Sequence, residues 1–277
     1  MSEFLIAVRG LRSRWIDLHL PTQNEEPRPY GERHALWFRG QGDVNWGLTP
    51  RLWRQEYIDA NEAEIRLEFE SVGQQLTQPQ RPIDKWQWYF LMQHYGAPTR
   101  LLDWTINPLA ALYFAIRDEF ERDASVWIVD PWRWNRAHVK YLYGPAIAGW
   151  EETQKYLLDL EDAFHTERDE KQTEKKWPVA IEPPHIDRRI AAQGSKFVLF
   201  GRERNMIDSP AINNPKGGKT KHAILDKIVV PKRSIQALRE ELTQVGINDS
   251  TMFPDLGGLG RHVAWEWQRL KSPKRKT

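Results

Sequence analysis

One stretch of the sequence organises the rest: Gln93-His94-Tyr95-Gly96-Ala97-Pro98-Thr99-Arg100-Leu101-Leu102-Asp103-Trp104-Thr105. It sets Arg100 and Asp103 on either side of two leucines, so that charge lies in apolar surroundings. Buried ions are costly unless they are paired or serve a site. We therefore expect either a structural ion pair between Arg100 and Asp103 or the polar groups of a binding site.

Helices are predicted before and after this stretch. A helix opened by Asp84 and closed by Gly96 is apolar most of the way round, so it should be central. Pro108 is well placed to open an apolar helix that runs to Asp118. We therefore expect the polar residues between the two helices to lie on a fixed loop, where binding and catalytic groups concentrate.

The remaining pattern mixes strands and helices without a regular alternation. Short strands rich in aromatic or β-branched residues are expected at 35–41, at 125–129, just after Gln193 and at 224–230. Three more helices are expected from apolar residues at helical spacing, which should face the core. In the first helix these residues are Ile65, Phe69, Val72 and Leu76. In the second, which Ser234 should cap, they are Ile235, Leu238, Leu242 and Val245, and in the third they are Leu259, Val263, Trp267 and Leu270. This combination predicts an α+β fold with a mixed central sheet and packed helices.

Three parts of the chain are distinguished by composition. Residues 1–32 read as a covering segment, and residues 33–268 form the main domain with a charged helical insertion, a surface helix or a lid, at about 150–176. Residues 269–277 form a basic tail, which is either a solvated end or a weak nucleic-acid contact.

Composition excludes several classes of protein. The chain has no cysteine, which rules out disulfides, zinc–thiolate sites and a cysteine nucleophile. The N-terminus is no signal peptide, and the longest apolar run, 109–116, is too short to cross a bilayer, so we expect cytoplasmic residence and no membrane partner. We find no spacing typical of a metal site, no Walker loop and no Gly-x-Ser-x-Gly elbow. Each of the 14 tryptophans is expected in the core first, with stacking against a ligand ring as the alternative.

Four charged or titratable residues are candidates for one site. Arg39 ends the first expected strand, and Arg100 and Asp103 follow His94 in the central stretch. Two guanidiniums near a carboxylate suit the bidentate recognition of a pyrophosphate. His94 suits an acid, a base or a phosphate donor near neutral pH. The structural alternatives are a salt-bridged Arg39, a buried Arg100–Asp103 pair and a hydrogen-bonded His94 at a helix end.

The sequence resembles the FRG domain family, named for its Phe/Tyr-Arg-Gly motif. The blocks that carry the resemblance are Phe38-Arg39-Gly40-Gln41, the central stretch 93–105, the following 107–115, Gln193-Gly194 with Phe197, and 252–259. The resemblance implies that residues 33–268 form an FRG domain. It implies a likeness to accessory and defence proteins of bacteria and phages.

A more distant similarity is to ADP-ribosyltransferases, which cleave the nicotinamide–ribose bond of NAD. That similarity implies a split sheet, an Arg or His on a first strand, an aromatic residue for nicotinamide, and a Glu, Asp or Gln before a later strand; Arg39, Tyr95 and Gln193 stand in these places. Transferases usually have Glu at the last place, and a Gln supplies no negative charge to an oxocarbenium-like transition state. Either Glu182, Asp187 or Asp103 supplies that charge, or the site only binds.

Together these considerations give two sets of candidate residues. The candidate catalytic residues are Arg39, His94, Asp103 and Gln193. The candidate NAD-binding residues are Arg39, Gly40, Gln41, Tyr95, Thr99, Arg100 and Trp104.

Three functions remain open. The first is a bacterial or phage defence or toxin-type effector that uses NAD as substrate and modifies a nucleic acid or a protein. The second is a metal-dependent nucleic-acid-cleaving enzyme that uses His94 and Asp103. The third is a non-catalytic module that senses a nucleotide or a phage protein.

Overall fold

The structure is a computed structural model. It describes residues 1–17, 36–57, 59–77, 84–118, 121–139, 142, 144–148, 177–183, 188–201 and 224–271. The expected insertion at 150–176 and the end of the basic tail, 272–277, lie outside these residues.

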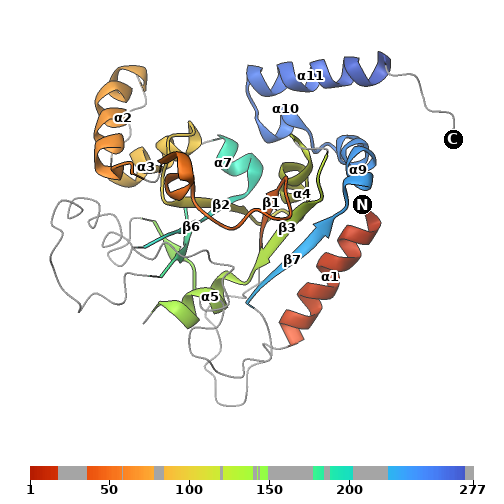
Figure 1. The fold of residues 1–277 in the computed structure, drawn as a ribbon, viewed down its shortest axis with the longest axis horizontal. Coiled ribbons are helices and arrows are strands. Elements are labelled where there is room, and N and C mark those ends of the chain that lie inside the picture. Colours follow the sequence, from red (N-terminus) through yellow and green to blue (C-terminus); the bar gives the residue numbers. More distant parts are fainter. Residues whose placement is uncertain are drawn as a thin grey trace.

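The described strands form one seven-stranded sheet, in the order β4-β5-β6-β2-β1-β3-β7 (Figure 1). Their bounds are β1 Trp37–Gln41, β2 Leu101–Thr105, β3 Ala124–Val129, β4 Ala146–Ile147, β5 Val179–Glu182, β6 Ser195–Leu199 and β7 Leu225–Val230. Neighbouring strands are antiparallel except β4 and β5, which are parallel. The α+β prediction with a mixed sheet is confirmed.

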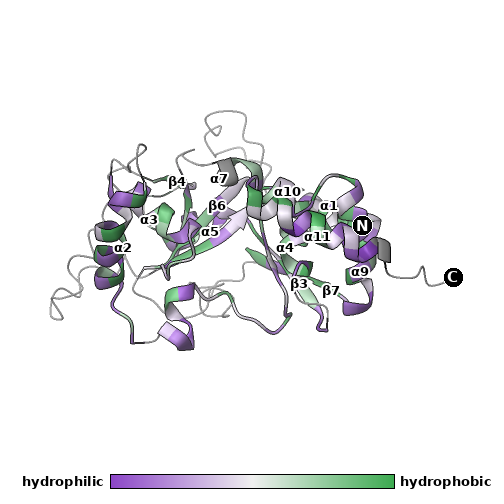
Figure 2. Cartoon of the chain, turned by 90° about the horizontal axis from the view of Figure 1, so that it is seen from above, coloured by the Kyte–Doolittle hydropathy of each residue, from purple (hydrophilic) through white to green (hydrophobic). Residues whose placement is uncertain are grey.

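The described helices lie on both faces and at both ends of this sheet (Figure 1). The α-helices are α1 Ser2–Asp17, α2 Glu62–Leu76, α3 Lys85–His94, α4 Pro108–Ile116, α5 Pro131–His138, α7 Arg188–Gln193, α9 Lys232–Gln244, α10 Asp249–Met252 and α11 Leu256–Lys271, and the short 3-10 turns are η1 Arg51–Trp53 and η2 Gln55–Tyr57. None of the described helices has the length and apolar character needed to cross a membrane. The end helices α2 and α9 contain both hydrophilic and hydrophobic residues, whereas the strands between them are largely hydrophobic (Figure 2).

Local sequence explains where these helices begin. The Asp84 side chain accepts the N–H of Gln87 at the start of α3. Asn107 does the same for Leu109 and Ala110 ahead of α4, where Pro108 occupies the first helical position.

The predicted Ser234 cap is wrong, because the cap position of α9 is Pro231, three residues earlier. Pro231 precedes the first residue, Lys232, whose N–H donates over 2.8 Å to the Asp123 carboxylate. The cap of α9 therefore comes from a segment far away in the sequence, which no local pattern announces.

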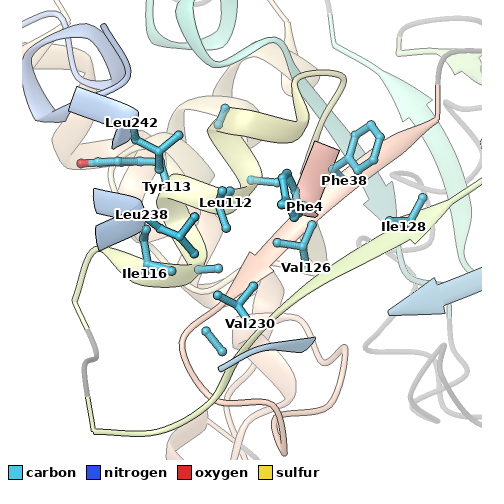
Figure 3. Packing of buried hydrophobic residues seen from close by; sticks show 14 of the residues in the cluster. Phe4, Phe38, Leu112, Tyr113, Ile116, Val126, Ile128, Val230, Leu238 and Leu242 are labelled. Atoms are coloured by element: carbon cyan, nitrogen blue, oxygen red, sulfur yellow. The ribbon is translucent and has the colours of Figure 1, made fainter. Parts of the chain in front are cut away.

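Buried apolar side chains form three cores. The first lies between α1, α4, α9 and strands β1, β3 and β7, and Figure 3 shows members such as Ile116, Val230 and Leu238. The second, on the other face, contains four tryptophans, which confirms the first expectation for these rings: Trp37, Trp104, Trp127 and Trp134. The third joins α3 to β5 and β6.

Strand alternation places the first and third cores on the same face of the sheet. Phe38 of β1 belongs to the first core and is paired with Thr105 of β2, so the two side chains share a face. Leu101, four residues before Thr105 on β2, shares that face and belongs to the third core. The two cores therefore lie side by side, one on β1 and one on β2.

Three expectations from the sequence are corrected. The loop predicted after Gly96 is short, since 101–105 form β2 and pair with β6 along their whole length. Burial of apolar residues on both faces of β2 outweighs the one charge, Asp103, whose side chain stays 56% exposed.

The other two corrections concern helix faces. On α2, the inner residues Ile65 and Phe69 pack against the third core, but Leu76 is 81% exposed. On α11 the predicted inner face points outward, with Trp267 62% exposed. That helix is held by its other side, where Arg261 bonds to the buried Asp249 at 3.1 Å.

Candidate functional site

The sheet opens between its two central strands. Each has a fully paired outer neighbour, β3 beside β1 and β6 beside β2. Within the described strands, β1 and β2 pair with each other at Phe38 and Thr105 alone. Beyond that pair, Nη1 of Arg39 donates over 2.7 Å to the carbonyl oxygen of Asp103. A side-chain hydrogen bond thus spans a place where a backbone ladder would otherwise continue.

Gly40 explains how a helix covers this opening. A Cβ atom at Gly40 would lie 2.0 Å from the carbonyl oxygen of Ala111 and 2.4 Å from the amide nitrogen of Ala115. Backbone of β1 therefore touches backbone of α4, a contact that a residue with a side chain would prevent. In Phe38-Arg39-Gly40, Phe38 packs into the first core and the Arg39 side chain crosses the opening. Gly40 has no side chain, so α4 can pack directly on β1.

A cavity of about 330 Å³ lies at this opening. Its walls come from β1, β2, β6, the end of α3, α4 and the segment after α10. The lining residues are Phe38, Arg39, Gly40, Phe90, Gln93, His94, Asp103, Trp104, Thr105, Ala111, Phe114, Arg117, Asp118, Gln193, Ser195, Phe197 and Phe253.

The structure brings together all four candidate catalytic residues, because Arg39, His94, Asp103 and Gln193 line the same cavity. Of the further candidate ligand-binding residues, Gly40 and Trp104 also line it. The predicted convergence of the first strand, the central stretch and the residue before β6 is thus present.

The other ligand-binding candidates lie outside the lining. Gln41 is buried and hydrogen-bonds Trp127 and the carbonyl of Gly47. Tyr95 is 68% exposed, with its ring 4.8 Å from that of His94. Thr99 is fully buried, and its hydroxyl donates to Oε1 of Gln93.

Arg100 is tied into the frame rather than into the cavity. Its Nε lies 2.6 Å from Oε2 of Glu62 at the start of α2, and Nη1 donates to the carbonyl of Phe200. The hydroxyl of Tyr89 donates to Glu62 and accepts the backbone N–H of Arg100. Burial and the Glu62 charge raise the pKa of Tyr89 well above its usual value, so its proton stays in place. The expected Arg100–Asp103 pair is wrong, since Glu62 takes the Arg100 guanidinium.

Two side-chain donors lie near the Asp103 carboxylate. Nε2 of Gln93 donates to Oδ1 over 2.9 Å, and Nη1 of Arg39 lies 3.6 Å from Oδ2. The Thr99 hydroxyl donates in turn to Oε1 of Gln93. Burial lowers the pKa of Arg39, and Asp103 opposes that shift. A guanidinium nevertheless keeps its charge in proteins, so Arg39 brings a cation to the cavity.

Two buried donors of lining residues have no acceptor in the part of the chain that the structure describes. They are Nε of Arg39 and Nε1 of Trp104, whose ring belongs to the second core on the other face of the sheet. Buried donors are nearly always satisfied by protein or by an occupant such as water, ion or ligand. Of the two residues, Arg39 is the one whose side chain reaches Asp103, and its charge favours an occupant that carries acceptor oxygens.

Gln193 is fixed by its neighbours. Nε2 donates over 2.9 Å to the carbonyl of Met252, and the backbone carbonyl of Gln193 accepts the Thr105 hydroxyl. Gly194 follows with φ of +57°, a turn that leads from α7 into β6. Among the described residues, none donates to Oε1 of Gln193, which leaves an acceptor at the cavity.

The carboxylates proposed as alternatives to Gln193 are now located. Glu182 pairs with Lys196 at 2.9 Å and is absent from the lining, while Asp187 lies outside the described residues. Asp103 does line the cavity, and so does Asp118, which bonds to Arg117. No three described His, Asp or Glu side chains are grouped as a metal site would require.

Sequence reasoning missed several lining residues. The polar ones are Gln93, Thr105, Ser195, Arg117 and Asp118, and the aromatic ones are Phe38, Phe90, Phe114, Phe197 and Phe253. Gln93 had a signal, because it precedes His94 in the central stretch. The aromatic residues had none, since a wall phenylalanine and a core phenylalanine look alike in sequence.

The family model described as FRG domain matches residues 34–124. The chain contains an FRG domain. The match to this FRG domain includes β1, α3, β2 and α4, hence both sides of the opening and three of the four candidate catalytic residues. Gln193 and Phe253 complete the cavity from outside the matched segment. Comparison with curated proteins and with solved structures gave no match, so no ADP-ribosyltransferase is among the similar proteins.

Proposed function

We propose that the FRG domain binds NAD in this cavity and acts as an ADP-ribosyltransferase-like effector of a bacterium or phage, modifying a nucleic acid or a protein. One observation carries the proposal: Arg39, His94, Asp103 and Gln193, from separate parts of the chain, line one cavity where β1 and β2 part.

The Arg39 cation of the cavity supports a phosphate-bearing ligand. Arg39 is a buried cation on the lining, and its Nε lacks an acceptor among the described residues. Phosphate oxygens are strong acceptors, and guanidinium is the side chain best matched to them. We expect the Arg39 guanidinium to hold the phosphate next to the nicotinamide ribose.

The walls of the cavity support a flat cationic ring. The cavity is lined by the Asp103 carboxylate and by five phenylalanines, which are Phe38, Phe90, Phe114, Phe197 and Phe253. The nicotinamide of NAD is a pyridinium cation, which aromatic faces and a carboxylate both attract. A volume of about 330 Å³ is at the small end of ligand sites, which span roughly 300–1,000 Å³. We therefore expect the nicotinamide ribose inside and the adenosine outside.

The reaction assigns a role to each candidate. The bond between ribose C1′ and the ring nitrogen breaks, its electron pair leaves with neutral nicotinamide, and the sugar gains oxocarbenium character that Asp103 stabilises. A nucleophile of the target attacks C1′ and gives its proton to His94. Oε1 of Gln193 accepts a hydrogen bond from a ribose hydroxyl.

Labelled NAD tests this reaction. Incubation of the wild-type protein with NAD and cell lysate should release nicotinamide and label a target, and expression should slow the growth of a bacterial host. Asp103→Asn should lower nicotinamide release about 100-fold or more, the usual scale for one electrostatic group, and should relieve the growth defect. Asp59→Asn, an exposed carboxylate away from the lining, is the matched control.

Three outcomes would overturn the proposal. Absence of turnover together with absence of an NAD-induced rise in melting temperature rejects NAD as the ligand. A rise in melting temperature without release makes the domain a binding module. Metal-dependent cutting of RNA or DNA that Asp103→Asn abolishes would replace transfer with nucleic-acid cleavage.

A further inference from the structure

We propose that Thr99 and Gln93 are positioning residues that set the direction of the Asp103 carboxylate in the cavity. The functional part of this inference rests on the proposed role of Asp103 toward NAD. The structural part, a directional chain of hydrogen bonds from the backbone to the carboxylate, stands without it.

The chain starts at a backbone amide. The N–H of Leu101 donates over 3.1 Å to the Thr99 hydroxyl oxygen. A hydroxyl has one proton, and this one goes to Oε1 of Gln93. Thr99 is itself immobile, because it is fully buried and its carbonyl accepts the N–H of Leu52 in η1.

Thr99 and Asp103 together fix which way the Gln93 amide points. Oε1 must face the hydroxyl, so Nε2 faces Asp103 and donates to Oδ1 over 2.9 Å. A reversed amide would set two acceptors together at Asp103 and would take from the Thr99 proton its acceptor. The Thr99 hydroxyl, which lies outside the lining, therefore supports the orientation in which Gln93 presents an N–H to the carboxylate.

Asp103 needs this partner, because its other contact holds mainly the backbone. Nη1 of Arg39 lies 2.7 Å from the Asp103 carbonyl oxygen but 3.6 Å from Oδ2. With its side chain 56% exposed, Asp103 has room to turn about its Cα–Cβ bond. Gln93 makes the shorter contact to the carboxylate and so fixes its direction.

The test compares variants that remove one link each. Thr99→Val keeps the shape and loses the hydroxyl, Gln93→Met removes both polar ends, and Thr99→Ser restores the hydroxyl. Thr243→Val is the matched control, because that hydroxyl bonds a carbonyl within α9, away from the cavity. The first readout is the ¹³C resonance of the Asp103 carboxyl group, assigned with Asp103→Asn, and the second is the kcat and KM of nicotinamide release.

We expect Thr99→Val and Gln93→Met to move the Asp103 resonance, and Thr99→Ser and Thr243→Val to leave it in place. We expect kcat to fall about 100-fold in the first two with KM changed by less than about threefold, as for a misplaced reacting group. An Asp103 resonance unmoved in both, or moved equally by Thr243→Val, overturns the inference. If wild-type protein does not turn over NAD, the proposed function fails while the resonance still decides the positioning role. If Thr99→Val does not fold, Gln93→Met decides it.

Discussion

Arg39 and Gly40 are neighbours on β1 with different physical constraints. The guanidinium of Arg39 reaches the Asp103 carbonyl across the opening of the sheet, so its length and charge matter. Gly40 contributes the lack of a side chain, because α4 backbone lies where a Cβ would be. The sequence indicated the first role through a charge at the end of an apolar run. It gave no sign of the second, because the partner helix lies about seventy residues later, at 108–116.

Gly40→Ala should be strongly destabilising. The added Cβ would meet backbone atoms of Ala111 and Ala115, and neither can rotate away. We expect a loss of about 3 kcal/mol in the free energy of unfolding, the upper end for overpacking. Gly260→Ala in α11 is the control, since no atom lies within 4 Å of its Cβ position; it should be neutral or stabilising by up to about 1 kcal/mol. Urea unfolding of both variants measures this, and equal stability would contradict the close contact at Gly40.

At the level of elements, the helices flanking the central stretch were predictable and β2 was not. Asp84, Gly96, Asn107 and Pro108 are local signals, and the structure uses them as helix starts and a stop. Residues 101–105 carry a charge after a Gly and a Pro, which reads as a loop. Their strand character comes from pairing with β6, almost a hundred residues away. Tertiary pairing overrides local preference here.

Arg100 joins three elements. Its contacts reach Glu62 of α2, the Tyr89 hydroxyl of α3 through its own N–H, and the end of β6 through Phe200. The sequence could identify Arg100 as a buried charge but not its partner, which lies 38 residues earlier at the start of another helix.

Arg100→Met should cost about 3–5 kcal/mol of folding free energy, because it leaves the Glu62 carboxylate buried without its cation. The double variant Arg100→Met/Glu62→Leu should recover part of that loss, since an apolar pair of similar volume replaces the ions. Guanidinium unfolding of the wild type and the variants provides the comparison. A single variant that loses less than about 1 kcal/mol would show that the ion pair is not structural.

At the scale of the whole molecule, the cavity exists because two cores on one face meet where β1 and β2 separate. The first core includes Phe38, the third includes Phe90 and Phe197, and all three rings reach the cavity wall. The sequence placed Arg39 and Gln193 beside strands and Asp103 on a loop, and it did not encode the order β6-β2-β1 that makes their strands neighbours. The outward apolar face of α11 was missed for a related reason. Periodicity reports that a helix has an apolar side, and only the packed molecule determines where that side points.

Isothermal titration of NAD into the wild-type protein and Arg39→Gln tests most directly whether the cavity is a ligand site for NAD. We expect saturable binding with one site per chain in the wild type. We expect Kd to rise at least about tenfold in folded Arg39→Gln, the loss for about 1.5 kcal/mol of one charged hydrogen bond. Wild-type protein that gives no saturable heat, or Arg39→Gln that binds NAD with the wild-type Kd, would contradict an NAD site at the opening between β1 and β2.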